Sequence, residues 1–105
     1  MSAPVANPHR GEAAITIGGV PHVLRPSFTA LVAAEEELGP LLALVERAGP
    51  GQLRLSEIAS LFWHCLARQD GVSREQVGEA VTRHGLAAMA APLRSVLAQI
   101  LQGTG

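Results

Sequence analysis

The chain contains no lysine and only one cysteine. All eight cationic side chains are arginines, they are spaced singly with acidic residues between them, and the formal net charge is −1. Binding to a phosphate backbone needs clustered positive charge, so this pattern argues against a nucleic-acid partner. Cys65 is the single cysteine and cannot form an internal disulfide, which is typical of a reducing compartment.

Long apolar runs and targeting signals are missing as well. No run approaches the ~20 residues that span a bilayer, and residues 1–9 lack the basic start and apolar centre of a signal peptide. We therefore expect no membrane partner and a location in the cytoplasm. The 48% apolar content is enough for one core. We expect a flexible tail over residues 1–9 and a single domain over residues 10–103.

Residue types that carry chemistry are present but are not arranged for it. None of the four histidines lies four residues from another metal-ligand residue on a shared face, and no Cys-x-x-Cys occurs. Cys65 follows His64 directly, and adjacent side chains on a helix do not face each other. With Ile58 at the centre of the buried arc, Cys65 is predicted inside and His64 in solvent. Cys65 is then a structural cysteine, and we expect no enzyme activity, no metal and no cofactor.

The first third of the chain predicts a β-hairpin. Strands are expected over residues 12–17 and 20–25, joined by Gly18-Gly19, a two-residue turn that tolerates positive φ. The predicted cross-strand pairs are Ile17–Val20, Ile15–His22, Ala13–Leu24 and Glu12–Arg25. Because a two-stranded hairpin is marginal alone, one face must lean on the helices, and that face would carry Ala13, Ile15, Ile17, Val20 and Leu24.

Helical patterns fill the rest of the chain. Helices are expected over about residues 27–38, 40–48, 56–69, 73–84 and 86–102. Ser27 and Ser73 are the predicted N-caps, Gln76 completes a capping box, and Gly39 ends the first helix. Pro92 predicts a kink or a restart in the last helix. The fold class is α+β, mostly α: an N-terminal two-stranded hairpin packed on four to five short helices.

Apolar periodicity also predicts which side chains form the core. The residues expected to be buried together are Phe28, Leu31, Leu38, Ile58, Leu61, Phe62, Cys65, Leu66, Val77, Val81, Leu93, Leu97 and Ile100.

Two residues stand out as candidates for partner binding. Glu35 projects from the apolar arc of the first helix, whereas Glu36 and Glu37 are predicted to point into solvent. Glu35 is either a carboxylate at the core edge, paired with an arginine such as Arg25 or a backbone amide, or a contact point for a partner. Trp63 either covers a neighbouring helix or is an exposed anchor. The predicted partner-binding surface comprises Glu35, Trp63, Leu93, Leu97 and Ile100.

The order of these elements also resembles a known family. "HRGE", a strand, a Gly-Gly turn, "VLRPSF" and a helix ending at Leu38-Gly39 precede "LSEIASLFWHCL", "SREQVGEAV" and the Gly85-Leu86 helix start. This arrangement, over roughly residues 7–103, resembles the gene transfer agent tail family, whose members are labelled tail tube protein or tail assembly chaperone.

The resemblance implies a role and partners. The first interpretation is a chaperone that binds the apolar helix of the tape-measure protein while the tail tube forms, in a helix-in-groove mode that the apolar last helix suits. The alternative is a structural tail tube or tube-terminator subunit, which would be β-rich. Both imply binding to other tail proteins, and self-association is a further expectation.

Overall fold

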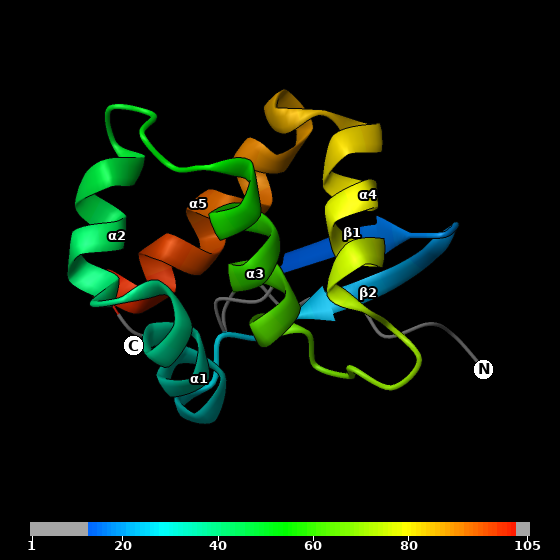
Figure 1. Cartoon of the computed structure of the whole chain (residues 1–105), viewed down its shortest axis with the longest axis horizontal. Helices are drawn as coiled ribbons and strands as arrows, with labels where there is room; N and C mark the ends of the chain where they lie inside the picture. Colours follow the sequence, from blue (N-terminus) through cyan, green and yellow to red (C-terminus); the bar gives the residue numbers. More distant parts are fainter. Residues whose placement is uncertain (1–12, 103–105) are drawn as a thin grey trace.

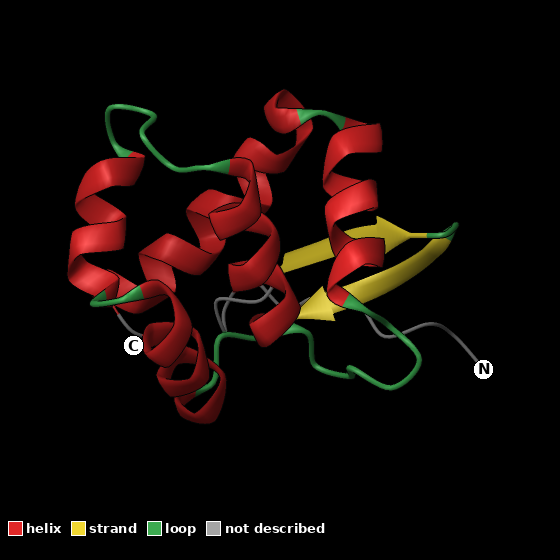
Figure 2. Ribbon diagram, in the orientation of Figure 1, coloured by secondary structure: helices red, strands yellow, loops and turns green. Residues whose placement is uncertain are grey.

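A computed structural model of the chain describes residues 13–102. The predicted fold class is confirmed: one short antiparallel sheet is followed by helices that make up most of the described residues (Figures 1 and 2). The elements in chain order are β1 (Ala13–Ile17), β2 (Val20–Leu24), α1 (Phe28–Leu38), α2 (Leu41–Ala48), α3 (Leu55–Cys65), α4 (Arg74–His84) and α5 (Leu86–Gln102). The expected tail, residues 1–9, lies outside the described residues.

The hairpin has the predicted register. Ile17 pairs with Val20, Ile15 with His22 and Ala13 with Leu24, while the predicted Glu12–Arg25 pair falls outside the described residues. Gly18 and Gly19 have φ of 58° and 81°, values that a two-residue hairpin turn requires and that glycine adopts without a Cβ clash. The sequence pattern was therefore sufficient to define this element.

The end of β2 is fastened to the end of α3. The Arg25 N–H donates to the Cys65 carbonyl at 2.6 Å, and the Ala67 N–H donates to the Val23 carbonyl at 2.9 Å. Because the backbone groups of this segment pair with the strand, they leave the helical ladder. The helix consequently ends at Cys65, four residues before the predicted Gln69.

Local capping explains where the helices begin. The Ser27 hydroxyl accepts from the Ala30 N–H and begins α1. Ser73 and Gln76 form the predicted reciprocal capping box at the start of α4. Gly39 ends α1 with φ of 87°, and its N–H donates to the Glu35 carbonyl. The last helix, α5, runs unbroken through Pro92, so the restart allowed by the sequence does not occur.

The core lies where α3 meets its neighbours. In the described chain, α3 packs between α1 and α4, while α5 contacts α2, α4 and β1. Figure 1 shows α2 and the hairpin at opposite ends of this arrangement, with α3 between them. The core cluster of buried residues comprises Ile15, Ile17, Leu24, Ala34, Leu41, Leu44, Ile58, Leu61, Phe62, Cys65, Leu66, Val77, Ala80, Val81, Met89 and Val96.

Most of the predicted core is confirmed, with one correction in the core and one on the covered face of the hairpin. Leu31, Leu38, Leu93, Leu97 and Ile100 are only partly buried, although they pack against the cluster. Phe28 was predicted inside but its exposed fraction is 84%, because α1 turns Ala34 to the core and Phe28 lies about 120° away around the helix. Val20 was expected on the covered face of the hairpin and is exposed, since it sits beside the turn.

Candidate functional site

Glu35 joins α1 to α2. Its side chain is exposed, yet one carboxylate oxygen accepts from the Leu41 N–H at 3.1 Å. Leu41 is the first residue of α2, whose N-cap is Pro40 and has no side-chain acceptor. A carboxylate at a helix N-terminus also meets the positive end of the helix dipole. Glu35 therefore makes the backbone-amide hydrogen bond of the first interpretation. Its role as a contact point for a partner stays a prediction.

Trp63 is half-buried and held by several contacts. Its indole Nε1 donates to the Val72 carbonyl at 3.3 Å, and the ring packs against the core cluster. The Arg74 guanidinium lies 4.6 Å from the ring centroid, a cation–π distance. His64 meets the ring edge-on at 5.1 Å. Trp63 thus covers the neighbouring α4, and its role in partner binding stays a prediction.

His64 is not in solvent as the sequence suggested, whereas Glu37 is exposed as predicted but forms specific contacts there. His64 Nε2 lies 2.9 Å from Glu37 Oε1, and Arg74 forms a second ion pair with the same oxygen. Hydrogen bonding from His64, then from Arg74, lowers the pKa of Glu37 to about 2. His64 is buried, which is possible because Glu37 supplies its polar partner. These residues join α1, α3 and α4, so the network orders three helices.

This network predicts how stability falls in acid. The folded-state pKa of Glu37 lies below its ordinary value of 4.5, so its contribution is complete above pH 4.5 and is lost as pH falls towards 2. Glu37→Gln should lower Tm at pH 7, and the gap to wild type should close between pH 4.5 and 2. Thermal melts across this range check it, with exposed Glu36→Gln as the matched control. A gap that persists undiminished at pH 2 would contradict the assignment.

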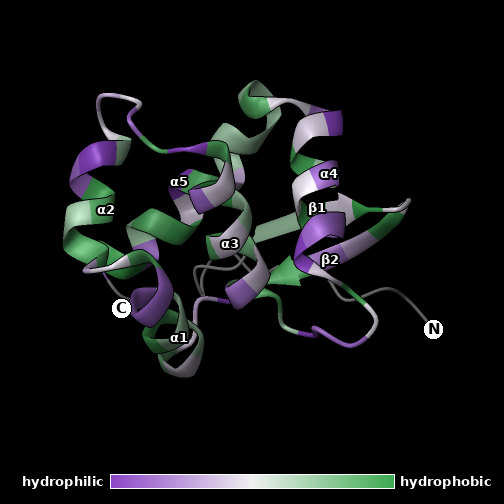
Figure 3. Cartoon of the chain, in the orientation of Figure 1, coloured by the Kyte–Doolittle hydropathy of each residue, from purple (hydrophilic) through white to green (hydrophobic). Residues whose placement is uncertain are grey.

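The predicted partner-binding residues on α5 belong to a helix with much apolar surface. Leu93, Leu97 and Ile100 are half-buried against the core, and among the seventeen residues of α5 only Met89 and Val96 are fully buried. Arg94 is the one charged residue of this helix, which appears mostly green or pale in Figure 3.

Exposed leucines extend this surface at the end of α5. Leu101 has an exposed fraction of 56%, and Leu42 on α2 has one of 61%; the end of α5 lies beside α2 (Figure 1). We name Leu42, Leu97, Ile100 and Leu101 the α2–α5 face. The five predicted partner-binding residues thus separate: Leu97 and Ile100 belong to this face, Leu93 lies one turn earlier, and Glu35 and Trp63 make the contacts described above.

Chemistry at the remaining candidates is limited. Burial raises the pKa of the Cys65 thiol to about 12, so the thiolate needed for nucleophilic attack is scarce at neutral pH. Within residues 13–102, no three His, Cys, Asp or Glu side chains come together to hold a metal ion. No helix in this part of the chain is long and apolar enough to cross a membrane.

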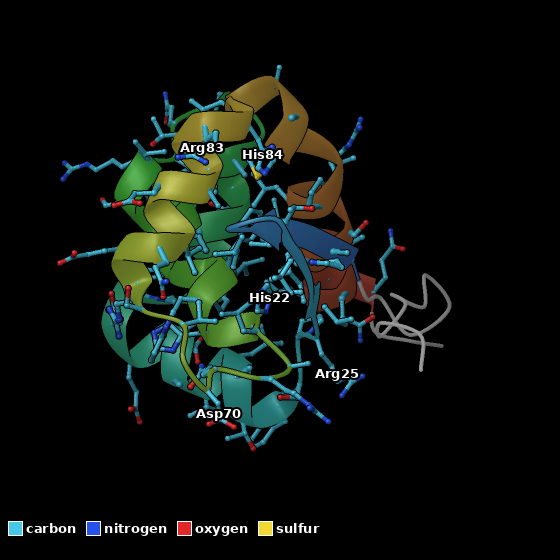
Figure 4. The ribbon with its side chains drawn as sticks, turned by 90° about the vertical axis from the view of Figure 1, so that its right-hand side faces the viewer. His22, Arg25, Asp70, Arg83 and His84 are labelled. Carbon is cyan, nitrogen blue, oxygen red and sulfur yellow. The ribbon has the colours of Figure 1, made fainter. Side chains whose placement is uncertain are left out.

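Sequence reasoning missed a cleft of about 630 Å³ between the hairpin and α4. Figure 4 looks onto this side, with Arg83 and His84 above, His22 near the middle and Asp70 below. His84 Nε2 lies 3.0 Å from the Thr16 carbonyl oxygen and ties the end of α4 to β1. These residues come from three separate segments, so no local pattern could have grouped them. We name this feature the hairpin–α4 cleft.

Comparison with known proteins identifies the family. A family model described as "Phage tail tube protein, GTA-gp10" matches residues 10–103 of the 105. No match was found among curated proteins or among solved structures. The match spans nearly the whole chain and agrees with the resemblance seen in the sequence. The chain belongs to the phage tail tube protein, GTA-gp10 family.

Proposed function

We propose that this tail protein acts during assembly as a chaperone that binds an apolar helix of the tape-measure protein on its α2–α5 face. The observation that supports this most strongly is α5, a seventeen-residue helix with a single charge and two fully buried side chains. Apolar side chains that the fold leaves uncovered are typical of a binding surface. An amphipathic helix would cover them by lying along α5, in a helix-in-groove mode.

The size of this surface suits a partner that must later be released. Burying one exposed leucine contributes about 1.5–3 kcal/mol. The face offers Leu42 and Leu101 as exposed side chains, with Leu97 and Ile100 half-buried on the same helix as Leu101. Part of that gain is offset by ordering the partner. The net binding free energy therefore favours reversible binding over a permanent complex, as a chaperone requires.

Capture of the tape-measure protein tests the proposal. Leu101→Glu places a charge in the α2–α5 face and should reduce capture at least about tenfold, a loss typical of an interface hot spot. The matched control is Leu86→Glu: Leu86 lies on the same helix with an exposed fraction of 57% against 56% for Leu101. It stands about 22 Å away along the helix and should leave capture unchanged. The measurement is a pulldown of coexpressed, tagged tape-measure protein.

Two results would overturn this assignment. Equal capture of wild type and Leu101→Glu would remove the α2–α5 face from the interaction. Equal loss in both leucine variants would mean that general hydrophobicity, and not this face, governs capture. Thermal melts of both variants should match wild type, because both side chains are exposed.

The description of the family favours a second candidate, a structural subunit of the tail tube. A tube wall built by hydrogen bonds between sheets needs long strand edges, and each strand here has five residues. The short strands therefore favour the chaperone over the tube subunit. Mass spectrometry of purified particles distinguishes the two: a tube subunit is retained in many copies per particle, whereas a chaperone is present during assembly and absent from the finished tail.

A further inference from the structure

We propose that α2 is a movable lid on α5, held closed by an ion pair, and that it moves aside to admit the partner helix. The ion pair joins Arg47 to Glu57, and we name it the α2 latch. The identity of the partner helix rests on the proposed function. The movement of α2 itself is measured on the free protein, so the two proposals can fail separately.

The α2–α5 face is only partly open in the closed position of α2. Leu42 and Leu101 are exposed, whereas Leu97 and Ile100 are half-buried against the core. The end of α5 that carries Leu97 and Ile100 lies beside α2 (Figure 1). A helix that packs along α5 needs apolar side chains from successive turns on one side. It reaches them fully only if α2 moves aside.

The lid has the same chemistry as the helix for which it would make room. α2 has eight residues, with Leu41 and Leu44 buried in the core cluster and Leu42 and Glu46 exposed on the other side. It is thus a short amphipathic helix, and its main contacts are with α1 and α5. A partner helix with a similar apolar face would replace the contacts on α5, and Leu42 would contact that helix from its flank.

The connections on both sides of α2 suit such a movement. Gly39 and Pro40 join α1 to α2, and Gly39 has a φ of 87°. After α2, the N–H groups of Gly51 and Gln52 donate to carbonyls of its last turn, so this short turn moves together with the helix. None of residues 49–54 is buried. Hinges are typically a few loop residues of this kind, which absorb the changes in φ and ψ.

The α2 latch fastens the end of the lid. Arg47, in the last turn of α2, donates from Nη1 to Glu57 Oε1 at 3.0 Å and from Nη2 to Glu57 Oε2 at 2.6 Å. Glu57 lies in the first turn of α3 and also accepts from the Arg54 N–H. The bonds from Arg47, and then the bond from the Arg54 backbone, lower the pKa of Glu57 to about 2. The latch is therefore a charged, bidentate pair at neutral pH, between two helices whose main contacts are with other elements.

The other end of α2 is held close to its pivot. Glu35 on α1 accepts from the Leu41 N–H at 3.1 Å, directly beside the connection through Gly39 and Pro40. A single bond at this place restrains rotation about the connection only weakly. Arg47 lies six residues further along the helix, about 9 Å away, where the displacement of the lid is larger. Release of the α2 latch is therefore the step that frees α2.

The latch exists only while α2 is closed, so it opposes binding of the partner. Movement of α2 also uncovers Leu41 and Leu44, which makes the closed form predominate in the free protein. The factor by which the latch stabilises the closed form is the factor by which it weakens the apparent affinity for a helix that needs the open form. Hydrogen bonds to charged groups shift an equilibrium about tenfold, and the partial exposure of Arg47 reduces this effect. The expected factor is about five.

Amide hydrogen exchange of the free protein tests the movement. In wild type, the amides of α2 should exchange at least about tenfold faster than the slowest amides of α3 and α4, after correction for intrinsic rates. Their exchange should depend only weakly on denaturant, because a local opening exposes little surface.

Variants of the latch connect this exchange to the ion pair. Arg47→Gln removes the pair and should speed exchange in α2 about fivefold. Glu57→Gln keeps an acceptor for the Arg54 N–H and should have the same effect. Arg83→Gln is the matched control, since it removes the same charge from an exposed side chain on α4, a helix that lies away from α2 (Figure 1). It should leave exchange in α2 unchanged.

Capture of the tape-measure protein tests what the movement is for, and the sign of the effect is decisive. Arg47→Gln loosens α2, yet it should raise the apparent affinity for the tape-measure protein about fivefold. A purely structural role for the ion pair would lower capture or leave it unchanged. Glu57→Gln should also raise capture, and Arg83→Gln should match wild type. The measurement is a pulldown titrated with tagged tape-measure protein.

Three outcomes would overturn the proposal: α2 amides that exchange only through global unfolding, exchange in α2 that neither latch variant speeds, or latch variants that capture no better than a wild type that does capture. Failure of wild type and every variant to capture the tape-measure protein would overturn the chaperone role. Faster exchange of α2 in both latch variants would in that case still support a latched lid.

Discussion

Phe62→Ala should lower the free energy of unfolding by about 3–5 kcal/mol, the range for a large aromatic side chain removed from a packed core. Phe62 is fully buried on α3, the helix that packs against both α1 and α4. Its removal leaves a cavity that several elements would have to close together, and such cavities relax only in part. Urea or guanidinium titration of the purified chain measures the change.

The chain supplies its own matched control. Its only other phenylalanine, Phe28, has an exposed fraction of 84% against 0% for Phe62. Phe28→Ala should therefore change the free energy of unfolding by less than about 0.5 kcal/mol. Similar losses in both variants would mean that α1 or α3 is rotated relative to the arrangement described here.

Trp63→Ala should cost about 2–3 kcal/mol of stability, which places this residue mainly in the fold. The substitution removes half-buried aromatic surface, the ring beneath Arg74 and the hydrogen bond to the Val72 carbonyl. The Val72 carbonyl and Arg74 both lie near the start of α4, so the segment that leads into this helix should loosen as well. Chemical denaturation gives the total, and amide exchange at the start of α4 locates it.

Trp63→Phe separates the contribution of the hydrogen bond from the rest of the loss in stability. A phenyl ring keeps a face for Arg74 but has no N–H for Val72, so about 0.5–1.5 kcal/mol should be lost through the hydrogen bond. If Trp63→Ala is as stable as wild type, the indole is free to act as a binding anchor, and tape-measure capture by that variant becomes the decisive measurement.

Elements defined by neighbouring residues were predictable from the sequence. The Gly18-Gly19 turn defines the hairpin register, and the Ser73–Gln76 capping box defines the start of α4. In both cases the residues that make the contact are at most a few positions apart, so composition and spacing carry the information. The family resemblance also depended on the order of such local elements, and the match over residues 10–103 confirms it.

Features that depend on distant partners were not predictable. Periodicity placed Phe28 and Leu31 on one broad apolar arc, but only packing decides that the core meets the Ala34 side of it. His64 lay outside the arc centred on Ile58 and was assigned to solvent. Its burial depends on Glu37, 27 residues earlier on another helix, a partner that no local pattern indicates.

The candidate site also has one part that was predictable from the sequence and one part that was not. The apolar character of α5 was visible from its sequence, and Leu93, Leu97 and Ile100 lie half-buried on that helix. Their part in partner binding stays a prediction. The hairpin–α4 cleft was not visible, because His22, Asp70 and His84 are spread over the chain and meet through tertiary packing alone.

The tie between His84 and Thr16 has a consequence for the time course of folding. The two residues are 68 positions apart, and β1 packs against α4 and α5, which follow it by more than fifty residues in the chain. At 5–20 residues per second, a ribosome needs roughly 3 to 14 s to travel from Thr16 to His84. The hairpin is synthesised before these two helices, so α4 and α5 are not available to cover Ile15 and Ile17 during that interval. Completion of this part of the core is thereby deferred until α4 and α5 have been made.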